Sequence, residues 1–236
     1  MHTEAPSPRT WAWDWDAIIV AGGRARRLGG IDKTALVWNG RSLLDGVLAA
    51  AARARRICVV GSEANLPVSV LRTVERPRWG GPAAAIVAGL ETLNGAAGPG
   101  TDSDWIVVLA GDLLRPSEAV AALLHELEVV AGADDTIDAR STIADGVIGV
   151  DGAGRRQPLL AVYRRAALAT AATVSGSAEN LSVMSLIGAL TLHELHLPES
   201  LSADVDTPAD AARLGIEVPH DRADSDLGPA HDSASP

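Results

Sequence analysis

Residues 21–33, AGGRARRLGGIDK, combine the side chains and the spacing best suited to binding phosphate. The segment directly follows the apolar run AIIV of residues 17–20, and its glycines leave backbone N–H groups open to phosphate oxygens. Three arginines and Lys33, the only lysine of the chain, add positive charge. A lysine is a compact charge on a flexible stem, which suits a phosphate whose charge shifts during a reaction. The residues that we predict to contact a triphosphate are Ala21, Gly22, Gly23, Arg24, Arg27 and Lys33.

The spacing of these residues excludes two common nucleotide-binding loops. It is not the dinucleotide fingerprint G-x-G-x-x-G, and it is not the P-loop G-x-x-x-x-G-K followed by Ser or Thr. Lys33 comes ten positions after Gly23, so the loop is long enough to arch over a triphosphate and return the ammonium group to it. The alternative is a surface loop whose arginines are solvated.

Short apolar runs alternate with helical patterns through the first half of the chain. We predict strands at 17–20, 57–60 and 105–110, with a weaker one at 68–71. The helices between these strands should begin after Ser42, at Pro82 and at about Pro116. We expect the first to run through LLDGVLAAAARAR and the last to end near Val130. Continuous apolar strands that alternate with helices predict a mostly parallel α/β sheet covered on both faces.

The second half of the chain has a different pattern. GVIGV and PLLAVY flank DGAGRRQ, which predicts a hairpin or a long loop between two strands. Helices at about 165–173 and 180–190 should follow, then a short strand in LTLHEL and a last helix from Pro208 to Gly215. We predict one domain over residues 14–217, a flexible lead-in over 1–13 and a disordered acidic tail over 218–236.

The stretch VAGGRARRLGGIDKTALVWNGRSLLDGVLAAA closely resembles the signature of the MobA-like nucleotidyltransferases, L-A-G-G-x-x-x-R-M-G-x-D-K followed by a short strand, a G-[RK]-x-L turn and a helix. The best-known members are molybdenum cofactor guanylyltransferases, which attach GMP from GTP to molybdopterin. The similarity runs from about residue 16 to 215. It implies a three-layer sandwich with a mostly parallel, Rossmann-like nucleotidyltransferase sheet, and a loop that wraps the triphosphate. The positions in register are Ala21, Gly22, Gly23, Arg27, Gly29, Asp32 and Lys33, with Leu28 in place of Met.

Two aspartates are candidate ligands for Mg²⁺, which proteins usually bind through one or two carboxylates, phosphates and water. Asp112 follows the strand 105–110 directly, where it could bind metal or close a turn, and the family has a metal-binding aspartate here. Asp206 could contribute to the same site or cap the helix that begins at Pro208. Asp32 could orient Lys33 or cap the turn. The residues that we predict to be catalytic are Lys33, Arg27 and Asp112.

The chain departs from the family pattern around the nucleotide pocket. Glu75 and the pair Gly81-Pro82 are kept, and Gly81 is a predicted nucleotide contact, but Arg76 replaces the acidic residue beside Glu75. Gly61 stands where the molybdenum cofactor enzymes tend to have Asn, which leaves the base preference open.

On the acceptor side, Gln157 replaces a common His before Pro158. Arg155 and Arg156 could meet an anionic acceptor or could be solvated residues of an exposed loop.

Composition narrows the classes of partner. The net charge of −10 argues against non-specific nucleic-acid binding, and the single cysteine, Cys58, excludes a disulfide framework and fits a buried strand residue. No apolar run approaches the ~20 residues of a membrane span, so we expect a cytoplasmic protein with no membrane partner.

The function that these observations favour is Mg²⁺-dependent transfer of GMP from GTP onto a phosphorylated small molecule such as molybdopterin, with release of pyrophosphate. The resemblance also suggests molybdoenzyme-maturation proteins as partners. One alternative is a nucleotidyltransferase with another acceptor, such as a sugar phosphate or a related cofactor. The other is a catalytically retired protein that still binds nucleotides, which Arg76 motivates. The missing fingerprint disfavours a dehydrogenase.

Overall fold

The computed structural model describes residues 13–22, 32–96, 98, 103–132, 144–202 and 215–217 of the chain. Several predicted features lie outside these residues. They are the loop positions Gly23, Arg24 and Arg27, Asp206, the last predicted helix up to residue 214, and the predicted terminal segments except Trp13.

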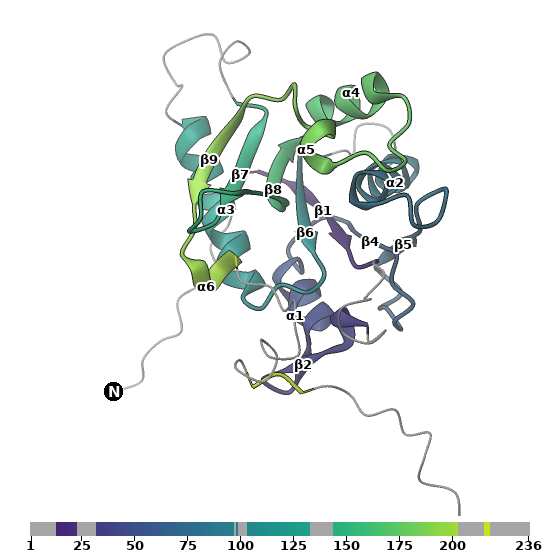
Figure 1. Ribbon diagram of the computed structural model, residues 1–236, viewed down its shortest axis with the longest axis vertical. Coiled ribbons are helices and arrows are strands. Elements are labelled where there is room, and N and C mark those ends of the chain that lie inside the picture. The colour runs from purple at the N-terminus through teal and green to yellow at the C-terminus, as the bar shows by residue number, and fades with distance from the viewer. Residues whose placement is uncertain are drawn as a thin grey trace, which may run out of the picture.

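Seven strands form the main sheet, and their spatial order is β5-β4-β1-β6-β8-β7-β9. Pairing is parallel between β5 and β4, β4 and β1, β1 and β6, and β7 and β9, while β8 runs antiparallel to both of its neighbours. The sheet is therefore mostly parallel, as predicted (Figure 1). In chain order the strands are β1 (Trp15–Val20), β4 (Ile57–Val60), β5 (Leu71–Thr73), β6 (Trp105–Ala110), β7 (Gly146–Val150), β8 (Arg156–Arg164) and β9 (Leu192–His196).

Helices cover both faces of this sheet, which gives the predicted three-layer arrangement. The α2, α4 and α5 helices lie together on one side in Figure 1, and α1, α3 and α6 lie on the other. A small second sheet pairs β2 (Val37–Trp38) with β3 (Arg41–Ser42). The helices are α1 (Leu43–Ala50), α2 (Pro82–Gly95), α3 (Pro116–Gly132), α4 (Arg165–Ser175), α5 (Val183–Leu186) and α6 (Glu199–Ser202), with a 3-10 turn, η2, at Lys33–Ala35.

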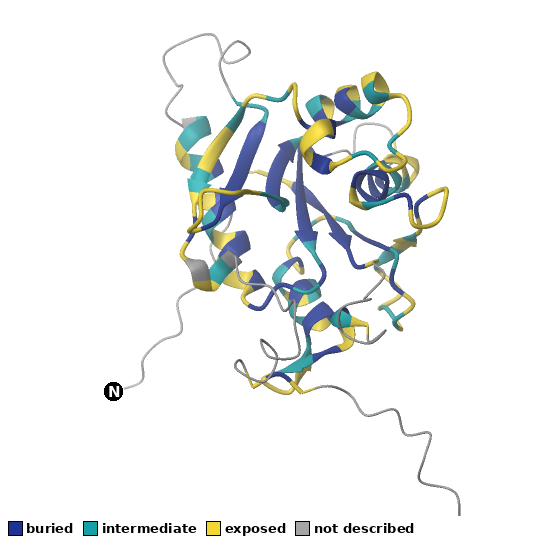
Figure 2. Cartoon of the chain, viewed as in Figure 1, coloured by how far each residue is buried: buried dark blue, intermediate teal, exposed yellow. Residues whose placement is uncertain are grey.

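The side chains of the central strand β1 alternate between two apolar cores. Ala17 and Ile19 pack with α1 and α3, while Ile18 and Val20 pack with α2. All four are buried, because a parallel strand covered on both faces has no solvent side. Figure 2 shows the strands at the centre of the sheet buried, whereas the edge strand β9 and the outer faces of the helices are largely exposed.

Cys58 lies in this core, where burial raises the pKa of its thiol to about 11, and the structure confirms it as a buried strand residue. Its neutral, enclosed thiol is unsuited to nucleophilic chemistry near neutral pH. No helix among the described residues has the length and apolar character that crossing a bilayer requires.

Some predicted elements differ in extent from the observed ones. The weak strand expected at 68–71 begins instead at Leu71, because the preceding residues form a turn in which the Val70 N–H donates to Pro67 O. The helix after Ser42 ends at Ala50 and not near Arg55, because the chain must turn back there to pair β4 with β1. The helix expected at 180–190 is the single turn α5.

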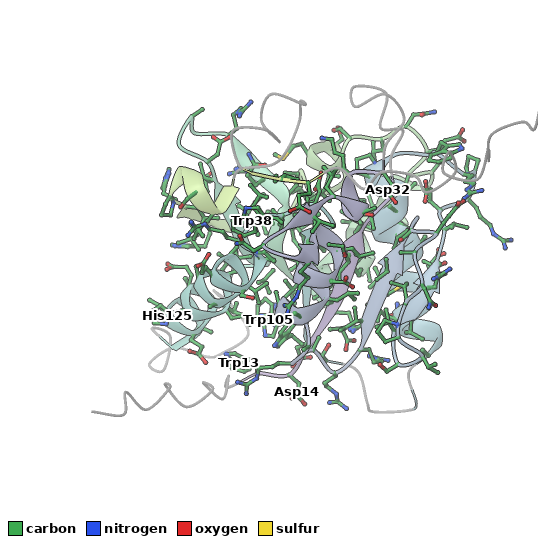
Figure 3. The ribbon with its side chains drawn as sticks, turned by 90° about the horizontal axis from the view of Figure 1, so that it is seen from below. Trp13, Asp14, Asp32, Trp38, Trp105 and His125 are labelled. Carbon is green, nitrogen blue, oxygen red and sulfur yellow. The ribbon has the colours of Figure 1, made fainter. Side chains whose placement is uncertain are left out.

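A buried ionic network fixes the end of the sheet where β1 begins. Asp16 is fully buried, and its Oδ2 accepts from Arg56 Nη2 at 2.6 Å and from Arg165 Nη2. Arg165 also donates to Ser103 O at 2.7 Å and to Asn94 Oδ1 at 2.6 Å. Figure 3 places Asp14 and Trp105 at this end of the sheet and Asp32 at the opposite end. The network is therefore structural and remote from the ends of the strands where the predicted site residues lie.

Candidate functional site

A cleft of about 900 Å³ opens at the carboxyl ends of β1 and β6 and is also lined by residues that follow β5. This is the edge at which parallel α/β sheets bind ligands. Apolar residues line part of the cleft, among them Val20, Ala110 and Leu159, and charged side chains also line it. The described residues that line the cleft are Val20, Ala21, Gly22, Asp32, Lys33, Thr34, Glu75, Arg78, Trp79, Gly81, Pro82, Ala85, Ala110, Asp112, Leu159 and Asn180.

Lys33 and Asp112 meet in this cleft. Lys33 returns to the sheet after the loop that leaves β1, and Asp112 follows β6 after one intervening glycine. The Lys33 Nζ lies 4.0 Å from Asp112 Oδ2, and each side chain is about one fifth exposed. The cation predicted to bind phosphate and the carboxylate predicted to bind metal therefore face the same volume.

Asp32 acts as the cap of the turn that presents Lys33. Its Oδ1 accepts from the Thr34 backbone N–H at 2.9 Å and from Thr34 Oγ1 at 2.7 Å. Such an aspartate cap satisfies backbone donors that the short 3-10 turn leaves open. Of the two roles that the sequence left open for Asp32, the structure shows the cap.

Glycine at position 111 fits the close approach of the exits of β1 and β6. A Cβ there would stand 3.0 Å from Ala21 Cβ and 3.2 Å from Thr34 Cγ2. The Gly111 N–H donates to Val20 O at 2.9 Å, which ties the chain just before Asp112 to the end of β1. Asp112 is therefore held in register with Ala21 and Gly22, where the segment predicted to bind phosphate begins.

A second close approach explains the glycine at position 61. Gly61 has φ +85°, and a Cβ there would stand 2.6 Å from Gly22 Cα. Any larger residue, including the Asn common among the molybdenum cofactor enzymes, would force the exits of β1 and β4 apart. Glycine in place of the family's Asn therefore allows the close contact between position 61 and the Gly22 backbone. It also leaves position 61 without a side chain.

Gly81 and Pro82 begin α2 at the wall of the cleft. Gly81 has φ +94° and ψ 174°, a conformation that is essentially restricted to glycine, and Pro82 takes the first helical position. The first N–H groups of a helix have no intrahelical acceptor and carry the positive end of its dipole. The start of α2 therefore adds donors to the cleft without adding a charged side chain.

Glu75 and Trp79 line the end of the cleft on the β4 side. Glu75 is buried, and its Oε1 accepts from the Trp79 backbone N–H at 3.0 Å. Trp79 has φ +71° and is 46% exposed, and the Arg78 guanidinium lies over its ring at 5.3 Å from the centroid. The Asn180 N–H donates to Gly80 O at 2.7 Å, which ties the loop after α4 to this wall.

Three of these cleft residues were not singled out from the sequence: Arg78, Trp79 and Asn180. An aromatic residue between an arginine and two glycines, just before a helix that starts at Pro82, is a local signal that could have indicated Trp79. Nothing near Asn180 in the sequence indicates that it reaches the cleft, because its position depends on a contact with the distant Gly80.

The paired arginines after β7 are engaged elsewhere. Arg155 Nε donates to Asp151 Oδ2 at 2.9 Å, and Arg156 Nε donates to Glu194 Oε1 at 2.6 Å. Hydrogen bonds from the Arg155 backbone N–H, from its side chain and from the Ala153 N–H hold the pKa of Asp151 below its usual value. Neither arginine is among the described residues that line the cleft. Of the hairpin or long loop predicted at 151–157, the structure shows a hairpin between β7 and β8, in which Arg155 pairs with Asp151.

The two ends of the cleft differ in chemistry. Lys33, Asp112 and Asp32 lie near the exits of β1 and β6, while Trp79 and the start of α2 lie toward β4 and β5. The described residues contain no cluster of three or more side chains of the types that ligate metals. The arrangement of these side chains suits an elongated ligand with anionic groups at one end and a flat ring at the other.

A family model described as the MobA-like NTP transferase domain matches residues 17–193. The curated molybdenum cofactor guanylyltransferase of Acidiphilium cryptum (strain JF-5) is 34% identical over 87 residues, which are 35% of this chain and 44% of that protein. That match spans less than half the length of the curated relative.

Solved structures of the same fold include molybdopterin-guanine dinucleotide biosynthesis protein A from Archaeoglobus fulgidus. It has a TM-score of 0.54 and 19% identity, and the match covers 84% of this chain and 96% of that one. A Mycobacterium tuberculosis H37Rv protein crystallised in complex with manganese has a TM-score of 0.55 and 16% identity, with coverage of 85% and 97%. At these identities the likeness establishes a shared fold.

Proposed function

The chain belongs to the MobA-like NTP transferase family, whose domain model covers residues 17–193, and on this basis we propose that it transfers GMP from GTP to a phosphorylated acceptor, with molybdopterin as the acceptor. The observation that carries the proposal is the position of Lys33 and Asp112 in one cleft, 4.0 Å apart, at the carboxyl ends of the central strands. A triphosphate bound by the loop after β1 would bring its charge to this pair.

The proposed phosphate contacts are the exit of β1, with Ala21 and Gly22, and the ammonium group of Lys33. Gly81, at the start of α2 toward the other end of the cleft, is proposed to contact the nucleoside part of the ligand. Three further proposed contacts lie outside the described residues: Gly23, Arg24 and Arg27. Together they would place several donors around a polyanion in a chain of net charge −10, so that binding rests on a local cluster.

The residues present fit a Mg²⁺ ion that arrives with the nucleotide. Asp112 is one partly exposed carboxylate at the strand end, and this ion commonly takes one or two carboxylates and completes its shell with phosphate oxygens and water. We propose Asp112 as the ligand, with Asp206, outside the described residues, as a second. When bound, Mg²⁺ would neutralise charge on the phosphates and orient them for displacement.

In the proposed reaction an oxygen of the acceptor phosphate attacks the α-phosphorus of GTP. The bond from the α-phosphorus to its bridging oxygen breaks, and pyrophosphate leaves with the electron pair. Lys33 would hold the β- and γ-phosphates and balance the charge that grows on the leaving group. The remaining groups position the nucleotide, since this chemistry asks for alignment and charge neutralisation rather than a covalent intermediate.

Binding of a panel of ligands tests the proposal at low cost. GTP, ATP, CTP and NAD are each added with and without Mg²⁺, and the shift in thermal unfolding is measured, since a ligand that binds the folded state raises its apparent stability. We expect GTP with Mg²⁺ to give the largest shift. Binding of GTP without pyrophosphate release in the presence of any acceptor would favour a retired nucleotide-binding protein. Release with a sugar phosphate and not with molybdopterin would reassign the acceptor.

Three wider features belong to the same proposal. The catalytic unit would be the single domain of residues 14–217, the protein would act in the cytoplasm where nucleoside triphosphates are plentiful, and molybdoenzyme-maturation proteins would receive its product. Co-purification of such a protein with the tagged chain would test the last of these.

A further inference from the structure

Glu75 is a buried carboxylate in a cleft that we propose binds a polyanion. Its side chain lines the cleft with 7% of its surface exposed. A negative charge beside the triphosphate would oppose binding, so this carboxylate needs a different part of the ligand as its partner. The phosphate chemistry described above gives it no role.

The position of Glu75 places it away from the phosphate end. Its Oε2 lies 3.8 Å from where a Cβ on Gly61 would stand, so it sits at the end of β4. Asp112 follows β6, which is two strands away in the sheet order, or roughly 10 Å at the usual strand spacing. A nucleotide spans such a distance between its base and its phosphates.

The two oxygens of Glu75 have different surroundings. Oε1 accepts the Trp79 N–H, which fixes the orientation of the carboxylate. Oε2 accepts no hydrogen bond from the described residues, and none of their buried side-chain oxygens lacks a partner, so Oε2 is reached from the cleft. Because position 61 is glycine, that position places no side chain beside this oxygen.

We propose that Glu75 reads the Watson–Crick edge of guanine and thereby sets the base preference of the enzyme. An ionised carboxylate only accepts hydrogen bonds, so it needs a base with adjacent N–H donors. Guanine presents N1–H and the 2-amino group side by side. Adenine and cytosine place a ring acceptor next to their amino group, and uracil flanks its N–H with two carbonyls. Trp79, whose backbone holds the carboxylate, also offers an aromatic ring at the same end of the cleft.

This inference rests on the proposed function, since it concerns the base of the same nucleotide. The test is titration calorimetry of the full chain with three triphosphates in the presence of Mg²⁺: GTP, inosine triphosphate, which lacks the 2-amino group, and xanthosine triphosphate, which has a carbonyl there. Wild type should bind GTP more tightly than either analogue by roughly ten- to a hundredfold, the usual range for one hydrogen bond to a charged group.

The decisive variant is Glu75→Gln. Its amide oxygen can still accept the Trp79 N–H, while its amide nitrogen replaces Oε2 and can donate to the xanthine carbonyl. GTP affinity should fall and xanthosine triphosphate affinity should rise, which reverses the order of the two ligands. Glu91→Gln makes the same change at an exposed position of α2, and this variant should bind the triphosphates in the same order of affinity as wild type.

The outcomes separate the two proposals. Wild type that binds no triphosphate would overturn the proposed function and this inference with it. Wild type that binds GTP, together with a Glu75→Gln variant whose ratio of GTP to xanthosine triphosphate affinity is unchanged, would overturn the role of Glu75 alone. A wild-type preference for CTP or ATP would do the same. A purely structural role for Glu75 would weaken all three ligands equally and would not reverse their order.

Discussion

The ammonium nitrogen of Lys33 lies 4.0 Å from the Oδ2 atom of Asp112. The two residues follow neighbouring parallel strands, β1 and β6, and the tie between Gly111 and Val20 keeps these strand ends in register. In the absence of a ligand, a cation and a carboxylate this close together largely neutralise each other's charge. We propose that, in a cleft of about 900 Å³, the two residues mark where an anion and its metal ion enter together.

Lys33→Ala should weaken binding of GTP by about ten- to a hundredfold, since it removes one charge-assisted contact to phosphate. Thermal unfolding without ligand should stay close to wild type, because the side chain is partly exposed and its ion pair with Asp112 is long, at 4.0 Å. Calorimetric titration measures the affinity. Arg53→Ala, which removes an exposed cation after α1, is the matched control and should bind as wild type does.

Asp112→Asn should lower metal-dependent turnover by at least about a hundredfold while the fold stays intact. Affinity for GTP without metal should be unchanged or tighter, since a negative charge near Lys33 is lost. Pyrophosphate release as a function of Mg²⁺ concentration, together with metal-free titration, checks both parts. An unaffected rate would remove Asp112 from the site.

Gly61→Ala should destabilise the protein and weaken nucleotide binding, because its Cβ would stand 2.6 Å from Gly22 Cα at a φ of +85°. Gly40→Ala is the control that separates the cost of the steric clash from the cost of backbone strain. Gly40 also has a positive φ, +74°, but no atom of the described residues lies within 4 Å of an added Cβ, so only backbone strain of about 1–3 kcal/mol is expected there. Urea unfolding should show a larger loss for Gly61→Ala. Equal losses would mean that the strand exits can move apart.

Asp16→Ala should cost about 3–5 kcal/mol of unfolding free energy, since it leaves the buried Arg165 without its carboxylate. Asp14→Ala removes a neighbouring but largely exposed partner of Arg55 and should cost no more than about 1 kcal/mol. Denaturant unfolding measures both. Because Asp16 lies at the opposite end of the sheet from the cleft, the folded fraction of its variant should bind nucleotide normally. An equal loss of unfolding free energy in the Asp16→Ala and Asp14→Ala variants would contradict the role given to Asp16.

Much of the fold could be predicted from local sequence signals. The strands β1, β4 and β6 are continuous apolar runs, and the starts of α2 and α3 are marked by proline, so their bounds were predicted closely. The family and the enzyme class predicted from the loop motif are confirmed by the family match. Predictions were wrong where long-range pairing decides the outcome. The helix α1 stops early because the Arg55 N–H must reach Trp15 O, and no local residue signals this contact.

The candidate site likewise contains residues that local motifs indicated and residues that only long-range contacts place there. Lys33, Asp112, Gly22 and Gly81 line one cleft, and each was indicated by a short motif next to a strand or helix end. Asn180 reaches the cleft from far along the chain, and Asp16 pairs with a distant arginine, so neither could be inferred from its neighbours in sequence. The ligand and metal contacts assigned to all of the site residues stay predictions, and Gly23, Arg24, Arg27 and Asp206 lie outside the described residues.

The most direct test of the central claim is transfer itself. The full chain is incubated with Mg²⁺, molybdopterin and GTP labelled on the α-phosphate, and both the pyrophosphate and the labelled acceptor are measured. The proposed site predicts stoichiometric pyrophosphate and labelled acceptor with wild type, and neither with Asp112→Asn. Efficient transfer by the Asp112→Asn variant, or no transfer by wild type to any phosphorylated acceptor, would contradict the proposal.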